Sequence, residues 1–250
     1  MSMLGHPSRI ALAGCAVIAS VVACSKKDQP KDDRVAPSAS AAGPAAGMKR
    51  YEITAGFASF LIDAPLEKIK GKSSKVRGNI DIDPKNMKAS RGRIEVDLDD
   101  LHTETFQDEE KNKAQTGHAK NWVEIGPDVD AQHREENRWA RFTVQSVDDA
   151  SATQLAAVST GQPVTMKVTG EFWLHGVSAP KTVTTTVTFA APPEAPSSVR
   201  IVTAEPLTIS LKQHDVKPRD LAGKFLSGAL EKIGQKIDDT VQISLDLTAK

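Results

Sequence analysis

The side chains that could catalyse a reaction or bind a metal ion are scattered along the chain. Five histidines follow the N-terminal region: His102, His118, His133, His175 and His214. No two are spaced i, i+2 or i, i+4, the spacing that presents two imidazoles to one metal ion. His175 lies in an expected turn and His214 precedes Asp215, so we expect both to be structural or exposed.

Other catalytic signatures are also missing from the sequence. The carboxylate pairs Asp99-Asp100 and Asp148-Asp149 are typical of turns rather than of an acid–base couple. There is no G-x-S-x-G motif, no glycine-rich phosphate loop and no C-x-x-C motif. We therefore expect no enzymatic activity, no metal site and no cofactor.

Both cysteines lie near the start of the chain, at Cys15 and Cys24. Residues 10–22 are an apolar run of the length of a signal-peptide core, too short to span a bilayer. The run ends in Val21-Val22-Ala23-Cys24 before polar residues, which resembles a bacterial lipobox. The resemblance implies that residues 1–23 are a signal peptide and that Cys24 is acylated. Several acyl chains, at about 0.8 kcal/mol per buried methylene, would anchor the protein permanently to a membrane.

Two alternatives to lipidation at Cys24 remain. Leu12-Ala13-Gly14-Cys15 fits the lipobox consensus better, but it leaves too few apolar residues after Arg9 for a signal-peptide core. The protein could also be an ordinary secreted protein with a buried or paired cysteine. If Cys24 is the lipidated residue, no thiol remains for a disulfide or a metal site. Ser25 after the cysteine, by resemblance to known lipoproteins, indicates the outer membrane, with the protein facing the periplasm.

The composition separates a tether from a folded domain. Residues 25–47 are first charged and then rich in Ala, Pro, Ser and Gly, so they cannot bury a core. We expect residues 24–47 to be the lipidated cysteine and a flexible tether, and residues 48–250 to be one domain. The 32 basic and 32 acidic residues balance, and aromatic residues make up only 4%, so nothing indicates nucleic-acid binding.

Apolar residues recur with a period of two through most of residues 48–250. This pattern predicts eight strands, near residues 51–62, 76–82, 94–98, 140–144, 164–174, 183–189, 209–211 and 241–247. Most connections are too short for parallel pairing, so the sheet should be antiparallel with one buried face. Closure into an eight-stranded barrel would remove the exposed edges and leave an interior for side chains or one elongated ligand.

Two segments break the period of two. Residues 104–121 are polar, and we expect a loop with a helical turn there. Residues 219–238 repeat apolar side chains every four residues, as in Leu221, Phe225 and Ile233, and this predicts one amphipathic helix before the last strand. That helix could pack on the barrel or cap its end, and the alternative is that it lies on a membrane surface.

Three stretches resemble the YceI-like family. They are LHGVSAPKTVTTTVTF (174–189), GNIDIDPKNMKASRGRIEVDLDDLHT (78–103) and ISLKQHDVKPRD (209–220). The resemblance implies a secreted or periplasmic protein with a lipocalin-like antiparallel barrel, in a family of which some members bind long polyisoprenoid chains in the lumen. The chain departs from the family pattern at residues 115–125, where only His118 and one aromatic residue, Trp122, remain.

The resemblance and the strand pattern together favour a carrier of an apolar lipid or isoprenoid-like chain, anchored to the membrane by its lipidated cysteine. The alternative is a filled barrel, packed by residues such as Phe57, Phe142, Phe172 and Phe189, that serves as a structural or protein-interaction module of the envelope. If the lumen is open, the apolar parity of the strands predicts its lining: Phe142, Val144, Met166, Val168, Phe172, Leu174, Val183, Val187, Ile209 and Ile243.

Overall fold

The computed structural model describes residues 43–63, 68–192, 195–217 and 239–250. The strands of the sheet are β1 (Lys49–Asp63), β2 (Lys68–Ser73), β3 (Val76–Ile82), β4 (Arg91–Asp97), β5 (His102–Thr103), β6 (Trp139–Ala150), β7 (Pro163–Leu174), β8 (Val177–Phe189), β9 (Val199–Thr203), β10 (Leu207–Ser210) and β11 (Thr240–Ala249). The helices are α1 (Glu109–Trp122) and α2 (Ala131–Asn137), with short 3₁₀ turns η1 (Met87–Ala89), η2 (Leu98–Asp100), η3 (Leu155–Ala157) and η4 (Lys212–His214).

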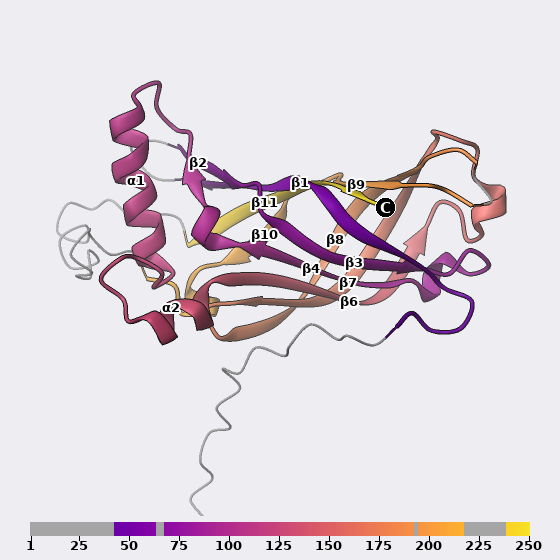
Figure 1. Ribbon diagram of the computed structural model, residues 1–250, viewed down its shortest axis with the longest axis horizontal. Coiled ribbons are helices and arrows are strands. Elements are labelled where there is room, and N and C mark those ends of the chain that lie inside the picture. Colours follow the sequence, from indigo (N-terminus) through magenta and orange to yellow (C-terminus); the bar gives the residue numbers. More distant parts are fainter. Residues whose placement is uncertain (1–42, 64–67, 193–194, 218–238) are drawn as a thin grey trace, which may run out of the picture. The chain divides into compact units, whose positions relative to one another are not determined.

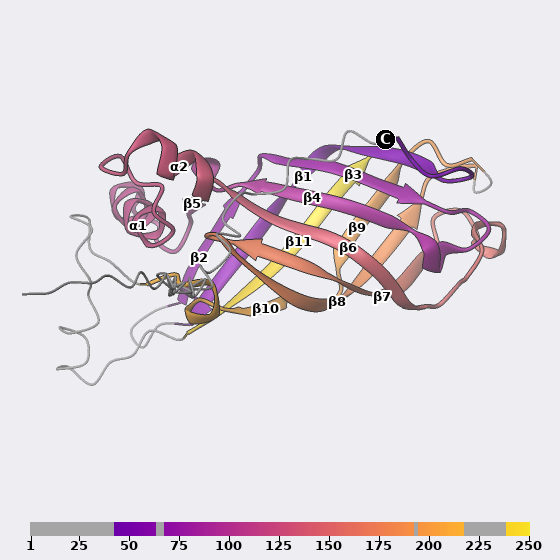
Figure 2. The same ribbon diagram turned by 90° about the horizontal axis from the view of Figure 1, so that it is seen from below.

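The sheet is antiparallel throughout and closes on itself. Its order is β10-β11-β9-β8-β7-β6-β4-β3-β1-β2-β5, and β11 also pairs with β1, from Ile53↔Ala249 to Ile62↔Val241. Three positions around the ring are each filled by two strands: β2 followed by β3, β4 followed by β5, and β9 followed by β10. The ring therefore has eight positions, and the predicted eight-stranded antiparallel barrel is confirmed (Figures 1 and 2).

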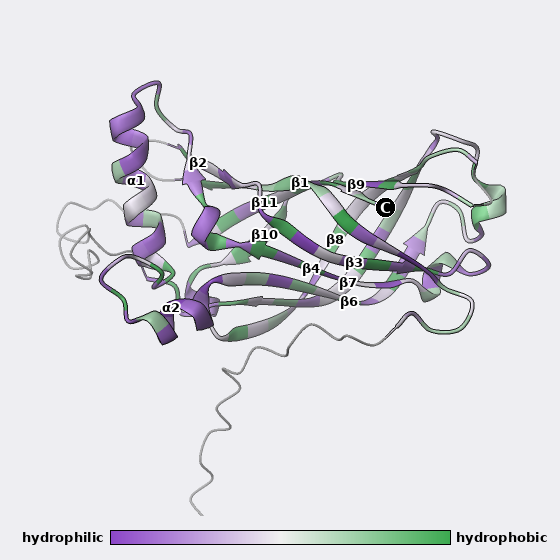
Figure 3. Cartoon of the chain, viewed as in Figure 1, coloured by the Kyte–Doolittle hydropathy of each residue, from purple (hydrophilic) through white to green (hydrophobic). Residues whose placement is uncertain are grey.

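Alternation of side chains separates the inside of the barrel from the outside. On β7, Val164, Met166 and Val168 are buried, while the intervening Thr165 and Lys167 are exposed. The same alternation colours the strands in stripes of hydrophobic and hydrophilic residues in Figure 3. Each large apolar side chain that is fully buried in this way contributes about 1.5–3 kcal/mol. The hydrophobic core of the protein is thus the interior of the barrel.

The expectation of a loop at residues 104–121 is wrong, because α1 is a 14-residue helix there. Asp108 begins it: its Oδ1 accepts hydrogen bonds from the backbone N–H groups of Glu110 (3.0 Å) and Lys111 (3.2 Å). The helix is almost entirely hydrophilic in Figure 3, so it lacks the apolar stripe by which a helix is usually recognised in a sequence. The expectation of only one substantial helix is wrong for the same reason.

Figures 1 and 2 place α1 and α2 at the same end of the barrel as β2 and β5. The last residue of α1, Trp122, and nearby Ile125 are buried in the hydrophobic core. In the part of the chain that the structure describes, no helix has both the length and the apolar character needed to cross a membrane. The helix predicted at residues 219–238 lies outside the described residues.

Candidate functional site

The barrel encloses an apolar cavity of about 170 Å³. Its wall comes from every position around the ring, so closure of the sheet is what creates it. The apolar lining residues are Ala58, Phe60, Ile80, Ile82, Ile94, Val96, Leu98, Leu101, Ala140, Phe142, Val144, Val147, Met166, Val168, Phe172, Val183, Val187, Ile201, Leu207, Ile243 and Leu245.

The few hydroxyl groups at this wall are already hydrogen-bonded to the barrel. Ser73 Oγ donates to the Asp97 carbonyl (2.8 Å), and Thr185 Oγ1 donates to the Met166 carbonyl (3.4 Å). Thr203 Oγ1 donates to the Leu245 carbonyl (3.1 Å), Ser59 Oγ to the Ser244 carbonyl (3.5 Å), and Ser90 Oγ accepts from the Asp83 N–H (3.3 Å). The lumen therefore favours a ligand that needs no hydrogen bonds from the wall.

Two arginines border the cavity, but their charged groups bond elsewhere. Arg91 Nη1 donates to the carbonyls of Ala89 (2.9 Å) and Ser90 (2.8 Å). Arg141 Nε donates to Glu95 Oε1 (3.0 Å), and its guanidinium lies 4.3 Å from the centre of the Trp173 ring. These contacts leave the binding of an apolar molecule as the chemistry that the lumen supports.

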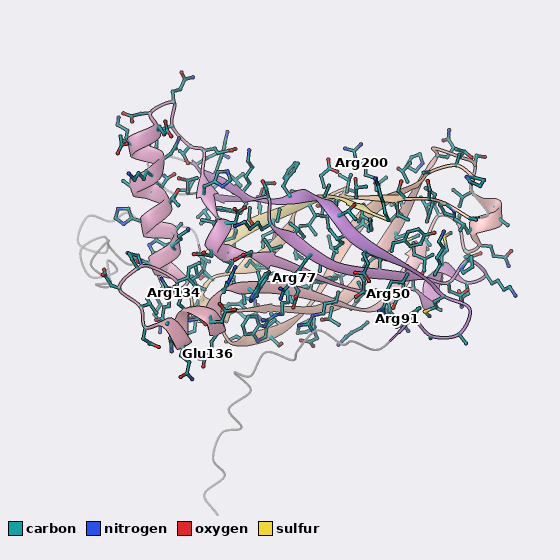
Figure 4. All side chains as sticks on the ribbon, viewed as in Figure 1. Arg50, Arg77, Arg91, Arg134, Glu136 and Arg200 are labelled. Atoms are coloured by element: carbon teal, nitrogen blue, oxygen red, sulfur yellow. The ribbon has the colours of Figure 1, made fainter. Side chains whose placement is uncertain are left out.

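Charged side chains gather on the outer face of the wall formed by β3, β4 and β6. Glu95 accepts hydrogen bonds from Arg77 (2.7 Å), Arg93 (2.8 Å) and Arg141 (3.0 Å). Burial by itself would raise the pKa of Glu95, but the hydrogen bonds and charges of Arg93 and Arg77 outweigh it and lower the pKa below its ordinary value. Farther round, Arg200, which Figure 4 shows pointing away from the barrel, pairs with Asp246 (2.7 Å). Charge is thus kept on the outer face of the barrel.

Eight of the ten residues predicted to line an open lumen lie at the cavity: Phe142, Val144, Met166, Val168, Phe172, Val183, Val187 and Ile243. Leu174 and Ile209 are buried but do not line it. Leu174 is the last residue of β7 and Ile209 belongs to the short β10, so both pack at a barrel end rather than along its middle. Of the aromatic residues considered as filling, Phe57 is exposed and Phe189 is buried away from the cavity.

The wall formed by β1 to β4 was missing from the predicted lining. Ile80, Ile82, Ile94 and Val96 all face the cavity and follow the same period of two as the predicted residues. That alternation could have identified them. Phe60 on β1 is a second omission, and its ring packs where a Cβ on Gly71 would lie, 2.5 Å from the ring.

Histidines at the helical end of the barrel have structural roles. His133 Nε2 on α2 lies 3.1 Å from Glu124 Oε2, and His175 Nε2 in the β7–β8 turn lies 3.3 Å from the same oxygen. His214 is fully buried, with Nδ1 3.0 Å from the Val177 carbonyl and its ring edge-on to Phe172. Across the described residues, no group of three or more His, Cys, Asp or Glu side chains is arranged to hold a metal ion.

A closed antiparallel barrel with an apolar lumen defines the lipocalin-like class of proteins. Within that class, the chain belongs to the YceI-like domain family, whose model matches residues 51–249. The family resemblance seen in the sequence motifs is thereby confirmed.

Solved structures resemble this chain at low sequence identity. A polyisoprenoid-binding domain from Saccharophagus degradans, implicated in plant cell wall breakdown, is 15% identical with a TM-score of 0.54, covering 80% of this chain and 97% of that one. BcnA from Burkholderia cenocepacia is 17% identical with a TM-score of 0.49, covering 78% of this chain and 96% of that one. Among curated proteins, none is similar enough to this chain to count as a match.

Proposed function

We propose that the protein is a membrane-anchored envelope protein that holds an apolar, isoprenoid-like chain in the lumen of its barrel. The observation that carries the proposal is the cavity itself, which is apolar and whose wall hydroxyls are hydrogen-bonded to the barrel. A chain placed there gains about 25 cal/mol for each Å² of apolar surface removed from water. The Saccharophagus degradans domain of the same fold is described as polyisoprenoid-binding, which supports this class of ligand.

The size of the cavity determines how a long chain could fit. About 170 Å³ is close to the volume of an apolar cavity, about 150 Å³, that takes up benzene. A longer chain therefore requires side chains of the wall to rotate. Met166 is suited to this movement because it is unbranched and has three rotatable bonds.

The anchor is the second part of the proposal. The lipobox-like Val21-Val22-Ala23-Cys24 supports acylation of Cys24, removal of residues 1–23 and attachment to the outer membrane on the periplasmic side. The tether up to residue 47 would then leave the barrel free to move beside the membrane.

The experiment that tests the ligand is extraction of the purified protein with organic solvent, followed by mass spectrometry. We expect a long-chain apolar compound in roughly stoichiometric amount, and its loss when the lumen is blocked. An extract without such a compound, together with no uptake of an added isoprenoid, would contradict the proposal.

A barrel that serves as a structural or protein-interaction module is the second candidate. One observation favours it: the free volume is below the range of about 300–1,000 Å³ common for ligand pockets. Under this alternative, Phe142 and Phe172 are core residues of a filled barrel rather than the wall of a binding site.

A further inference from the structure

The barrel wall has a seam at which the pairing of strands is interrupted. β1 pairs with β3 from Lys49 to Glu52 and with β2 from Ala58 to Asp63. Among the described residues, the intervening residues 53–57 have no paired residue among residues 74–78 on the neighbouring strand. We call these two facing segments the seam.

The seam arises because both neighbouring strands change which alternate residues face the lumen at the same level of the barrel. On β1 the inward side chains change from odd positions, such as Tyr51, to even positions, such as Ala58. On β2–β3 they change from odd positions, such as Ser73, to even positions, such as Ile80. Gly56, with φ +133°, sits at the turn on β1, next to a β-bulge between Ile53 and Ala55. A strand that changes faces cannot keep a regular ladder, so the pairing is interrupted here.

A second interruption of strand pairing, between β9 and β10, is bridged by a side chain. β11 pairs with β9 from Asp246 onward and with β10 up to Ile243, which leaves Ser244 and Leu245 between the two ladders. The Thr203 hydroxyl bridges that interruption, accepting from the Leu245 N–H and donating to the Leu245 carbonyl. In the described part of the chain, no side chain bridges the seam in this way.

The cavity reaches the seam from the inside. Ala58 and Ser73, the pair that ends the β1–β2 ladder, line the cavity at one end of the seam, and Ile80 lines it near the other end. The two ends of the barrel, by contrast, are packed with apolar side chains. Met87 and Phe189 are fully buried away from the helices.

The helical end of the barrel is packed in the same way. Trp122 and Ile125 are buried there and belong to the same hydrophobic core as Leu98. Within the described residues, the seam is therefore a place where the lumen borders an unpaired part of the wall.

The outside of the barrel beside the seam carries an exposed apolar side chain among lysines. Phe57, at the edge of the seam, is 40% exposed and is the large apolar residue most open to solvent in the described chain. A groove of about 560 Å³ starts at Phe57 and is also lined by Leu61, Lys70 and Lys72. Lys68 pairs with Asp63 (3.0 Å) and Lys72 pairs with Glu104, which also lines the groove. Lys70 is exposed and has no ion-pair partner among the described residues.

We propose that this docking face, formed by Phe57, Leu61, Lys68, Lys70 and Lys72 on β1 and β2, lies on an anionic lipid surface, with the seam as the route between bilayer and lumen. An aromatic ring can enter the boundary of the acyl chains while ammonium groups contact anionic headgroups. Contact with the bilayer would let an apolar chain reach the lumen without crossing water. The passage of a chain rests on the proposed function; the docking itself does not.

Docking is tested without any ligand. Residues 43–250 are suited to the measurement because they contain the whole closed sheet and no cysteine. They should sediment with vesicles of phosphatidylcholine and phosphatidylglycerol, less so at high salt, and not with phosphatidylcholine alone. Phe57→Ser and Lys70→Glu should each weaken this binding about fivefold or more, by loss of apolar insertion or of charge attraction.

A matched control is Lys88→Glu, which makes the same charge change at an exposed residue of η1. Binding by this variant should equal that of the wild type. The docking face is the wrong surface if the wild type ignores anionic vesicles, if it binds neutral vesicles equally well, or if Lys88→Glu weakens binding as much as Lys70→Glu.

The route is tested with dansyl-labelled farnesol as the probe. Phe57→Ser should take up the probe from solution as the wild type does, but take it up from anionic vesicles several-fold more slowly. Equal rates from vesicles would overturn the seam as a route and leave the proposed function intact. Failure of the wild type to take up the probe, even from solution, would count against the proposed function instead, while the sedimentation result still decides the docking face.

Discussion

His214 is a buried histidine that should make stability depend on pH. Burial lowers its pKa below the ordinary value of 6.5, despite the opposing hydrogen bond to the Val177 carbonyl, and nearby Lys181 and His175 lower it further. The unfolded chain therefore takes up a proton at His214 before the folded chain does. The stability contributed by the neutral ring is complete above about pH 6.5 and is lost as the pH falls toward the folded pKa.

Replacing His214 should flatten this pH dependence. His214→Leu should lose stability at pH 8, because it removes the hydrogen bond to Val177, but should show a smaller further loss between pH 7 and pH 5 than the wild type. Urea unfolding of residues 43–250 at a series of pH values measures this. Equal slopes for the two proteins would show that His214 does not produce the effect.

Glu95 compensates the buried guanidinium of Arg141 on the outer wall of the barrel. Glu95→Gln leaves that charge buried without its counter-ion, so we expect a loss of about 3–5 kcal/mol. Arg141→Met should cost clearly less, because Arg141 Nη1 has no hydrogen-bond partner among the described residues and Glu95 keeps Arg77 and Arg93. Chemical unfolding compares the variants, and a larger loss for Arg141→Met would contradict this account.

At the scale of elements, the strands were predictable because each one buries a single face. The period of two located β1, β3, β4, β6, β7, β8 and β11, and it gave most of the lumen residues on β6 to β8. It could not show that β2 and β3 share one position in the ring, because their inward parity changes between Ser73 and Val76. Strand pairing depends on residues far apart in the chain, so the local pattern could not predict the seam either.

The helix α1 was missed because its start is marked by a capping residue rather than by an apolar stripe. Asp108→Ala should remove the hydrogen bonds to the N–H groups of Glu110 and Lys111 and destabilise the helix by about 1 kcal/mol. Amide hydrogen exchange of α1 should quicken accordingly. Asp108→Asn, which keeps a capping oxygen, should remain close to the wild type, and equal protection in Asp108→Ala would argue against the cap.

At the scale of the whole molecule, the first prediction concerns the proposed lipid anchor. Cys24→Ala in the full chain should abolish incorporation of labelled palmitate and release the protein from the membrane fraction, because Cys24 alone follows a full-length apolar run. Cys15→Ala serves as the control and should change neither result. The opposite pattern would assign the lipobox to Leu12-Ala13-Gly14-Cys15.

The last question is whether the lumen is a binding site or a packed core, and two substitutions on one strand separate these readings. Val168 lines the cavity, whereas Val164, four residues earlier on β7 and also inward-facing, is buried but does not line it. Val168→Trp should fill free space and abolish uptake of an isoprenoid probe. Val164→Trp has no such space, so overpacking should lower its stability by about 1–3 kcal/mol.

Ligand extraction and thermal unfolding of both variants give the answer. An open lumen predicts that Val168→Trp loses the bound compound yet unfolds at a higher temperature than Val164→Trp. A filled barrel predicts that the two variants are destabilised equally and that neither changes what is extracted. If Val168→Trp still carries the ligand, the chain binds elsewhere, and the cavity is a packing defect of the core rather than the site of function.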